Sequence, residues 1–174
     1  MTSAVRLDEY IRAIPDFPKP GIVFRDITPL LAAPDALREA IHRMGQPFAD
    51  RGITKIAAAE ARGFLFGVAM AIELNVGFVP IRKPGKLPAE TIEESYELEY
   101  GTDTLQIHRD ALRSGDRVLV VDDLLATGGT LAACLELVRR GGAEVAGASC
   151  LIELPDLGGR DKLGSVEVAC LLSY

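Results

Sequence analysis

The 174-residue sequence has few of the residues that build metal centres and disulfide frameworks. Its three cysteines, Cys134, Cys150 and Cys170, are an odd number, lie far apart and include no C-x-x-C pair. This usage predicts buried free thiols in a reducing compartment, not a disulfide framework. The two histidines, His42 and His108, are too isolated in the sequence to suggest a metal site.

The chain also lacks an excess of positive charge and a long apolar run. Its formal net charge of −6 argues against a general nucleic-acid binder, although a local basic patch remains compatible with it. The most apolar stretch, residues 63–72, is far too short to span a bilayer. Charged residues near the start are unlike a secretory signal. We therefore expect a cytoplasmic protein that binds neither nucleic acid nor membrane.

Two familiar phosphate-binding motifs are missing as well. No G-x-x-x-x-G-K-[ST] loop is present and no G-x-G-x-x-G opens a helix, which excludes P-loop and standard dinucleotide-binding proteins by motif. The composition that is present, 48% hydrophobic and 25% charged residues, is ordinary for a soluble globular protein. Because no linker, repeat or low-complexity tract interrupts the chain, we expect one domain over residues 1–174.

The most informative stretch is Val118–Thr130, which reads V-L-V-V-D-D-L-L-A-T-G-G-T. Its aliphatic residues predict a strand buried on both faces, followed by two acids, a small-residue loop and a helix. Backbone N–H groups of such a loop and of the first helical turn can bind an anion such as phosphate. Thr127 and Thr130 add hydroxyl donors, and Thr130 is also a plausible N-cap.

Asp122 and Asp123 make this stretch more than an ordinary strand–turn–helix unit. Glycines at such a turn are often only conformational, but two adjacent carboxylates at the end of an apolar strand are poor packing residues. Residues that break the local pattern mark functional sites. Backbone donors for a phosphate, with carboxylates for sugar hydroxyls beside them, suit a ribose 5-phosphate.

Polar residues follow two further predicted strands. Strand 53–59 ends in Glu60–Gly63 (E-A-R-G) before an apolar helix at 64–74, and strand 77–81 is followed by Arg82–Lys86 (R-K-P-G-K). Each cation could be an ordinary surface group. However, the carboxyl ends of parallel strands meet at one edge of a sheet, where open α/β folds bind ligands. Cations together with the acids and the loop suit a sugar that carries two phosphate groups.

The rest of the pattern predicts helices, strands and one departure from the βα rhythm. By residue number the predictions are a helix at 5–14, an irregular apolar loop at 17–29, a helix at 34–50, a β-hairpin of 95–100 with 103–108, a helix at 131–140, strands at 145–154 and 166–172, and a polar loop at 155–164. The loop at 17–29 is either a lid or a strap across the core. The hairpin has a physical reason to cover a reactive state that water would trap.

Together these motifs resemble the type I phosphoribosyltransferases, over nearly the whole chain. Residues 118–130 resemble the family's motif for 5-phosphoribosyl diphosphate (PRPP). The segments 17–29, 60–67, 82–88 and 95–101 resemble, in order, its base-binding loop, diphosphate loop, basic segment and flexible catalytic loop.

The fold implied is α/β, with a mostly parallel central sheet flanked by helices. A small hood of mainly residues 1–33 with 153–165 and a flexible catalytic loop at about 90–108 complete it.

Within that family the motifs are most similar to those of the members that use adenine. The resemblance then implies a homodimeric purine-salvage enzyme that transfers the 5-phosphoribosyl group of PRPP to adenine, giving AMP and diphosphate. It also implies Mg²⁺, held mainly by PRPP and water, so that no dedicated metal ligands are expected.

The resemblance also assigns roles to single residues. Glu99 is the implied general acid/base at the purine, with Tyr100 beside it, while Val23 meets adenine through its backbone and Leu154 packs on the base. The other implied substrate-binding residues are Arg25, Arg62, Arg82, Lys86, Asp122, Asp123, Ala126, Thr127, Gly128, Gly129 and Thr130. The implied diphosphate loop is Glu60, Ala61, Arg62 and Gly63, with a non-proline cis peptide at Glu60–Ala61.

Two alternatives remain open. The same fold can serve hypoxanthine, guanine, xanthine or orotate, but enzymes for 6-oxopurines tend to use a lysine, and residues 152–157 contain none. A non-catalytic regulator that senses PRPP and binds nucleic acid usually has a basic face or an added domain, which this acidic chain lacks. Without the resemblance, Glu99 is one of several acids on the hairpin, because periodicity cannot single it out.

Overall fold

The computed structural model describes residues 5–97 and 101–174. The predicted catalytic Glu99 and its neighbour Tyr100 lie outside the described residues. By its internal contacts the chain divides into an N-terminal unit, Met1–Arg43, and a second unit, Met44–Tyr174. No helix in the described ranges combines the length and apolar character needed to cross a bilayer.

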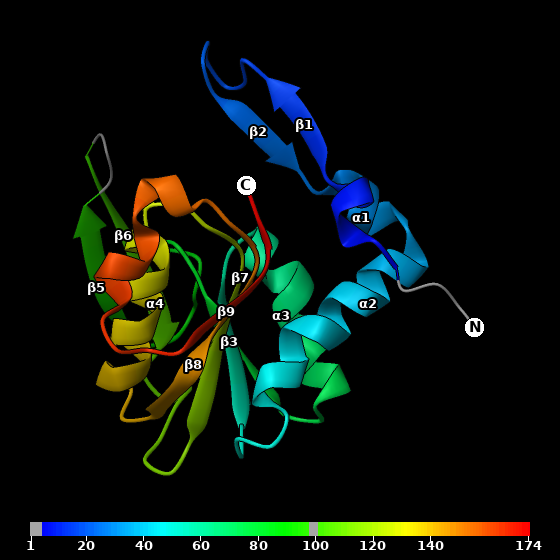
Figure 1. The fold of residues 1–174 in the computed structure, drawn as a ribbon. Helices are drawn as coiled ribbons and strands as arrows, with labels where there is room; N and C mark the ends of the chain where they lie inside the picture. Colours follow the sequence, from blue (N-terminus) through cyan, green and yellow to red (C-terminus); the bar gives the residue numbers. More distant parts are fainter. Residues whose placement is uncertain (1–4, 98–100) are drawn as a thin grey trace. The chain divides into compact units, whose positions relative to one another are not determined.

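The second unit is built on a five-stranded, fully parallel sheet with the order β4-β3-β7-β8-β9 (Figure 1). The strands are β3 (Lys55–Ala59), β4 (Gly77–Ile81), β7 (Arg117–Leu125), β8 (Glu144–Glu153) and β9 (Val168–Ser173). The predicted parallel sheet is confirmed, with β7 in the middle as its unbroken aliphatic run requires. The strand continues past the two aspartates, and Leu125 still pairs with Glu153 of β8.

Helices α3 (Arg62–Glu73) and α4 (Gly129–Arg140) lie on opposite faces of this sheet (Figure 1). The chain leaves β3 through α3 toward β4 and leaves β7 through α4 toward β8, so the two connections diverge. In open α/β sheets a crevice forms at the carboxyl ends of two neighbouring strands whose connections leave in opposite directions in this way. The topology therefore places a ligand site between the ends of β3 and β7.

Gly67 allows α3 to approach the sheet closely. A Cβ at this position would lie 2.8 Å from Cβ of Ala58 and 2.9 Å from Cε2 of Phe78, closer than real side chains pack. Beneath the helices, Val118 to Val121 of β7 are fully buried. Cys134 and Cys150 are buried free thiols, whereas Cys170 is only partly buried, so that part of the cysteine prediction is wrong.

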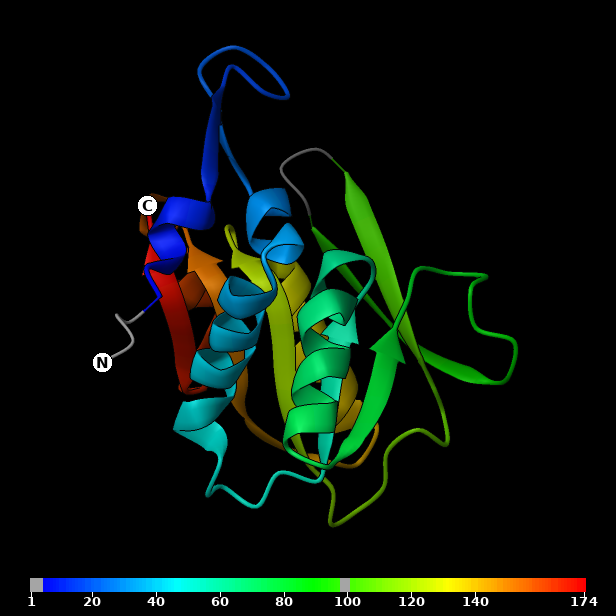
Figure 2. The ribbon, with the colours of Figure 1, turned by 90° about the vertical axis from the view of Figure 1, so that its right-hand side faces the viewer.

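The predicted β-hairpin is present as the antiparallel pair β5 (Thr91–Glu97) and β6 (Thr102–His108), which stands beside the main sheet (Figure 2, green). A bridge between Arg82 and Gln106 ties β6 to the chain just after β4. The region after β8, predicted as a polar loop, forms two short 3-10 turns, η3 (Pro155–Leu157) and η4 (Gly159–Leu163).

The N-terminal unit differs from its prediction. The expected helix at 5–14 is only a 3-10 turn, η1 (Leu7–Tyr10), because β1 (Arg12–Pro15) pairs with β2 (Val23–Asp26). Asp16 allows this pairing by accepting the backbone N–H of Gly21 at 2.8 Å, which closes the loop between the strands. The segment predicted to be irregular therefore contains a strand. The helices that follow are α1 (Thr28–Ala32) and α2 (Pro34–Gly45), with the 3-10 turn η2 (Gln46–Phe48) after α2.

Candidate functional site

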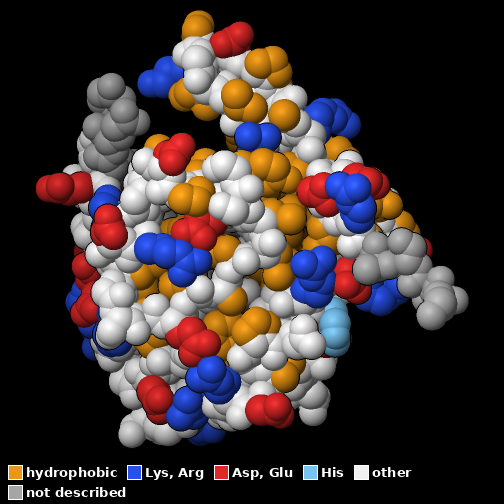
Figure 3. Space-filling model, viewed as in Figure 1, with side chains coloured by type: hydrophobic (Ala, Val, Ile, Leu, Met, Phe, Trp, Pro, Cys, Tyr) orange, Lys and Arg blue, Asp and Glu red, His pale blue; other side chains and the backbone are white. Residues whose placement is uncertain are grey.

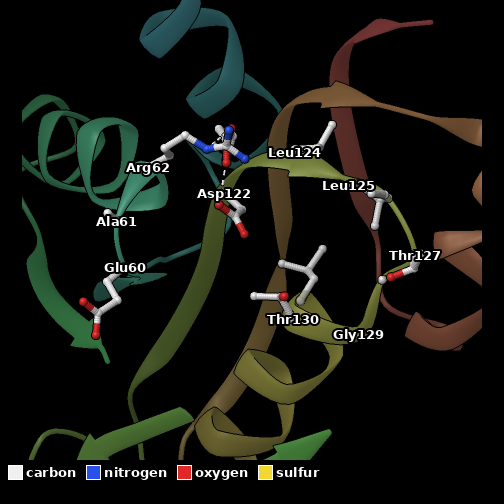
Figure 4. Close-up of a pocket in the computed structure, with 13 residues that line it drawn as sticks. Glu60, Ala61, Arg62, Asp122, Leu124, Leu125, Thr127, Gly129 and Thr130 are labelled. Carbon is white, nitrogen blue, oxygen red and sulfur yellow. Dashed lines mark hydrogen bonds and ion pairs between the residues drawn. The ribbon is translucent and has the colours of Figure 1, made fainter. Parts of the chain in front are cut away.

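A cavity of about 430 Å³ lies at the carboxyl ends of β3 and β7, where the topology places a ligand site (Figure 4). Its walls come from the residues after β3 and from the end of β7 through the first turn of α4. They are Glu60, Ala61, Arg62, Asp122, Asp123, Leu124, Leu125, Ala126, Thr127, Gly128, Gly129, Thr130 and Leu131. The structure thus brings two of the predicted motifs together around one cavity.

The two aspartates have different surroundings. Asp123 is buried and its Oδ2 lies 2.9 Å from Nε of Arg62, whereas Asp122 accepts the backbone N–H of Asp123 at 2.8 Å. The Asp122 side chain points toward the space between Glu60 and Thr130 (Figure 4). Arg62, which sequence alone allows to be a surface arginine, is therefore a wall of the cavity that neutralises one of the acids.

Burial raises the pKa of Asp122 well above its usual range, and the negative charge of Asp123 raises this pKa further. The N–H of Asp123 and the charge of Arg62 act in the opposite direction on the pKa without restoring it. A carboxylate held at such a cost gains from any ligand that brings hydrogen-bond donors or positive charge. The vicinal hydroxyls of a ribose supply such donors.

The loop before α4 presents its backbone to the cavity. Gly128 has a left-handed φ of 79° and occupies the N-cap position, so Thr130 lies in the first turn and the N-cap predicted for it is wrong. N–H groups of the first turn have no carbonyl partner within a helix, and the helix dipole makes this end positive. An anion such as a phosphate fits these groups. Thr127 is exposed beside them.

Thr130 also joins a network that sequence analysis missed. Its hydroxyl donates to the Tyr96 hydroxyl at 3.2 Å, and Tyr96 donates to Asp103 at 3.3 Å. Asp103 pairs in turn with Nζ of Lys83 at 3.0 Å. These side chains thus link the glycine loop, the hairpin and the basic segment. Because Thr130 and Tyr96 lie 34 residues apart in the sequence, no local motif could reveal the link between them.

Glu60 faces the basic segment. It accepts the backbone N–H of Lys83 at 2.6 Å and lies 3.2 Å from Nη2 of Arg82. The Lys83 N–H lowers the pKa of Glu60, against the effect of burial, and the charge of Arg82 lowers this pKa further. Glu60 therefore fixes the segment 82–86 beside the cavity.

Two of the three cations in that segment are neutralised internally, Arg82 by Glu60 and Lys83 by Asp103. Within the described ranges, Lys86 has no ion-pair partner, and its side chain is exposed. Lys86 is thus the cation of the segment best placed to meet an added phosphate, while ligand contact by Arg82 stays a prediction.

The other predicted residues are placed as follows. Val23 and Arg25 lie on β2 in the N-terminal unit. Leu154 follows β8, and its N–H donates to the carbonyl of Leu125, a residue of the cavity wall, at 2.9 Å. The non-proline cis peptide predicted at Glu60–Ala61 is confirmed.

The fold and the site agree with comparisons to known proteins. A family model for the phosphoribosyl transferase domain matches residues 26–171. The chain therefore belongs to the phosphoribosyltransferase family, enzymes that transfer a pentosyl group.

Within this family the chain groups with the adenine phosphoribosyltransferases. The one from Rhodopirellula baltica is 57% identical over 168 residues, 97% of this chain and 82% of that protein. Among solved structures, that from Thermoanaerobacter pseudethanolicus is 52% identical, with a TM-score of 0.93 and coverage of 97% of this chain and 100% of that one. The Saccharomyces cerevisiae enzyme, complexed with adenine and an imino-altritol 1,6-bisphosphate, is 40% identical, with a TM-score of 0.90 and coverage of 95% and 96%.

Proposed function

We propose that this enzyme transfers the 5-phosphoribosyl group of PRPP to adenine, giving AMP and diphosphate, in purine salvage. One observation carries the proposal: a single cavity brings Arg62, the Asp122–Asp123 pair and the glycine loop together at the ends of β3 and β7. A sugar with phosphate groups at both ends matches this arrangement, in which the two acids lie between a cation and a loop that can bind phosphate. The names of the relatives support adenine as the base.

The geometry suggests how PRPP would be held. The backbone of Ala126–Thr130 and the N-terminus of α4 bind the 5-phosphate, and the two aspartates accept hydrogen bonds from the ribose hydroxyls. The diphosphate then lies toward Arg62 and Lys86, whose positive charges stabilise the charge that develops on it as the C1–oxygen bond breaks. A ring nitrogen of adenine forms the new bond to C1.

Glu99 is the proposed general base for the proton on that ring nitrogen. Glu99→Gln should lower kcat by about 100-fold or more, since general acid–base groups contribute that much, and should change PRPP affinity far less. Glu97→Gln, at an exposed acid on the same hairpin, is the matched control and should retain activity. Equal kcat for Glu99→Gln and the parent enzyme would remove Glu99 from the mechanism.

We propose Mg²⁺ as the cofactor. In the described part of the chain, no three His, Cys, Asp or Glu side chains gather as a metal cage. Asp122 offers one carboxylate with a raised pKa, which suits an ion bound mainly by diphosphate oxygens and water. Bound there, the ion would neutralise charge on the diphosphate. Omitting Mg²⁺ should abolish AMP formation.

We also propose that the enzyme is a cytoplasmic homodimer. Helix α3 exposes Leu65, Val68 and Ile72, at 47%, 42% and 76% exposure, with the spacing that puts them on one helix face. A second copy of the chain is the occupant proposed for this face. Ile72→Lys should shift the sedimentation coefficient toward that of a monomer, while the control Leu157→Lys, at an apolar residue 50% exposed on η3, should not.

The deciding experiment measures AMP formation from adenine and PRPP with the purified enzyme, with hypoxanthine in a parallel reaction. We expect product from adenine alone. Comparable turnover of hypoxanthine would overturn the assignment of the base. PRPP binding without turnover of any base would favour the regulator alternative.

A further inference from the structure

The glycine loop of the cavity has a second backbone segment against its back. A Cβ on Gly128 would overlap the carbonyl oxygen of Gly159, and a Cβ on Gly159 would overlap the carbonyl oxygen of Ala126. The two backbones are therefore in direct contact with no side chain between them. Any displacement of Gly159 must move the loop, because close-packed backbone cannot absorb the shift.

Arg160, the next residue, fixes Gly159 to the sheet. Its Nε lies 2.6 Å from Oε1 of Glu153 and its Nη2 lies 2.7 Å from Oε2, which makes a two-pronged fork. Its Nη1 donates to the carbonyl of Val168 at 3.1 Å. All three guanidinium nitrogens are thus used, on the last residue of β8 and the first of β9. Such a fork fixes orientation as well as distance.

The two-pronged geometry of this pair and the burial of its carboxylate set it apart from an ordinary surface ion pair, which contributes little. Glu153 is only 13% exposed. The Arg160 guanidinium holds the pKa of Glu153 below its usual range despite partial burial. Neither residue lines the cavity, so the pair acts on the site indirectly, through the backbone that it holds.

We propose that Arg160 and Glu153 are positioning residues for the 5-phosphate: they hold Gly159 against Ala126–Gly128 and so keep the loop N–H groups aimed at the phosphate. The inference rests on the proposed function, and it goes beyond that function by naming residues that do not touch the ligand. Preorganised donors bind more tightly because the ordering cost is met before the ligand arrives.

The structure predicts a selective defect. AMP and PRPP both carry a 5-phosphate, whereas diphosphate is proposed to bind on the Arg62 and Lys86 side. Arg160→Gln should raise the Kd of AMP and the KM of PRPP by about 5- to 30-fold, the range that a modest loss of interaction gives. The Kd of diphosphate and kcat at saturating PRPP should change by less than about twofold.

Arg51→Gln is the matched control. Arg51 pairs with Glu167 at 3.1 Å and has the same 48% side-chain exposure as Arg160, but it lies outside the cavity wall and the η4 segment. Arg51→Gln should leave the Kd of AMP, the KM of PRPP, the Kd of diphosphate and kcat unchanged. Arg160→Lys keeps the charge but not the fork, and should therefore resemble Arg160→Gln more than the parent.

If Arg160→Gln does not fold, Glu153→Gln breaks the same fork with little change of shape and should show the same selective defect. Unchanged AMP binding in the folded variant would overturn the inference, as would an equal loss of AMP and diphosphate binding. Failure of the proposed function itself gives a different result, since the parent enzyme would then form no AMP from adenine and PRPP.

Discussion

The backbone N–H of Asp123 donates a 2.8 Å hydrogen bond to Oδ1 of Asp122, so the two neighbouring acids of β7 are joined to each other before any ligand binds. Nε of Arg62 pairs with the other acid, Asp123. Asp122 therefore carries most of the electrostatic cost of the site, and burial with the charge of Asp123 raises its pKa. A cost of this kind at a cavity wall is typical of a site built for a ligand.

Asp122→Asn should therefore stabilise the protein and impair its function. The amide keeps an oxygen to accept the Asp123 N–H but has no charge to bury. We expect Tm at pH 7 to rise by about 2–4 °C, which for a chain of this size corresponds to about 1 kcal/mol. PRPP should bind at least about tenfold more weakly, because a hydrogen bond from a sugar hydroxyl to a charged group is lost. Calorimetry and PRPP titration measure both effects.

The effect of Asp122→Asn on stability should depend on pH. A carboxyl with a raised pKa destabilises the folded state at every pH above that pKa, and the penalty disappears as pH falls to the ordinary value for aspartate. The stability gain of Asp122→Asn should thus be largest at neutral pH and vanish in acid. Asp156→Asn, at an exposed acid, is the control. A lower Tm for Asp122→Asn at pH 7 would contradict the assignment.

Gly67 offers a test of the packing between α3 and the sheet. Gly67→Ala would force a methyl group within 2.8 Å of Ala58 and 2.9 Å of Phe78, and overpacking of this kind costs about 1–3 kcal/mol. Gly45→Ala is the matched control in α2, because its nearest neighbour is 3.6 Å away and alanine favours helix there by about 0.5–1 kcal/mol. Urea unfolding should move the two variants in opposite directions.

The strands of the sheet were predictable because each one is an apolar run that ends in polar residues. β4 matches its predicted bounds, and the aliphatic run Val118–Val121 predicts the buried strand that the structure shows as β7. A strand buried on both faces needs consecutive apolar residues, and such a run can be read directly from the sequence. The N-terminal β1–β2 pair was missed because its strands are four residues long and are set by a turn that Asp16 and Gly21 close.

The candidate site was predictable where its residues are contiguous or follow neighbouring parallel strands, whereas the individual contacts between distant segments were hidden. The acids and the glycine loop lie in one stretch, so sequence placed them together. The contacts of Glu60 with Lys83 and of Gly159 with the loop join segments more than twenty residues apart. No periodicity or motif encodes such contacts, since tertiary packing alone determines them.

Glu60→Gln should release the basic segment. The variant loses the charge that faces the Lys83 N–H and Arg82, so we expect a loss of about 1–2 kcal/mol at pH 7. Because the pKa of Glu60 is lowered, this stabilisation is present above the ordinary pKa of a glutamate and is lost as pH falls through the lower folded value. The difference between variant and parent should therefore shrink in acid, while Glu136→Gln, on a mostly solvated pair, should show none.

Tyr96 links the hairpin to the loop in two ways that one substitution can separate. Its ring packs on Gly129, where a Cβ would lie 3.0 Å from Cδ2, and its hydroxyl accepts the proton of Thr130 and donates to Asp103. Burial raises the pKa of Tyr96, so the phenol stays protonated at neutral pH. The Thr130 proton can serve the Tyr96 hydroxyl or a bound phosphate, but not both at once.

Tyr96→Phe keeps the ring and removes this competition. We expect Tm to fall by about 2–4 °C, because two hydrogen bonds are lost. AMP should bind about threefold more tightly. In the parent, Thr130 must break its hydrogen bond to Tyr96 before it can donate to the phosphate, and in the variant it has no such bond to break. Tyr10→Phe, at a tyrosine whose hydroxyl has no hydrogen bond among the described residues, is the control. Markedly weaker AMP binding by Tyr96→Phe would instead place the Tyr96 hydroxyl itself in the recognition of the ligand.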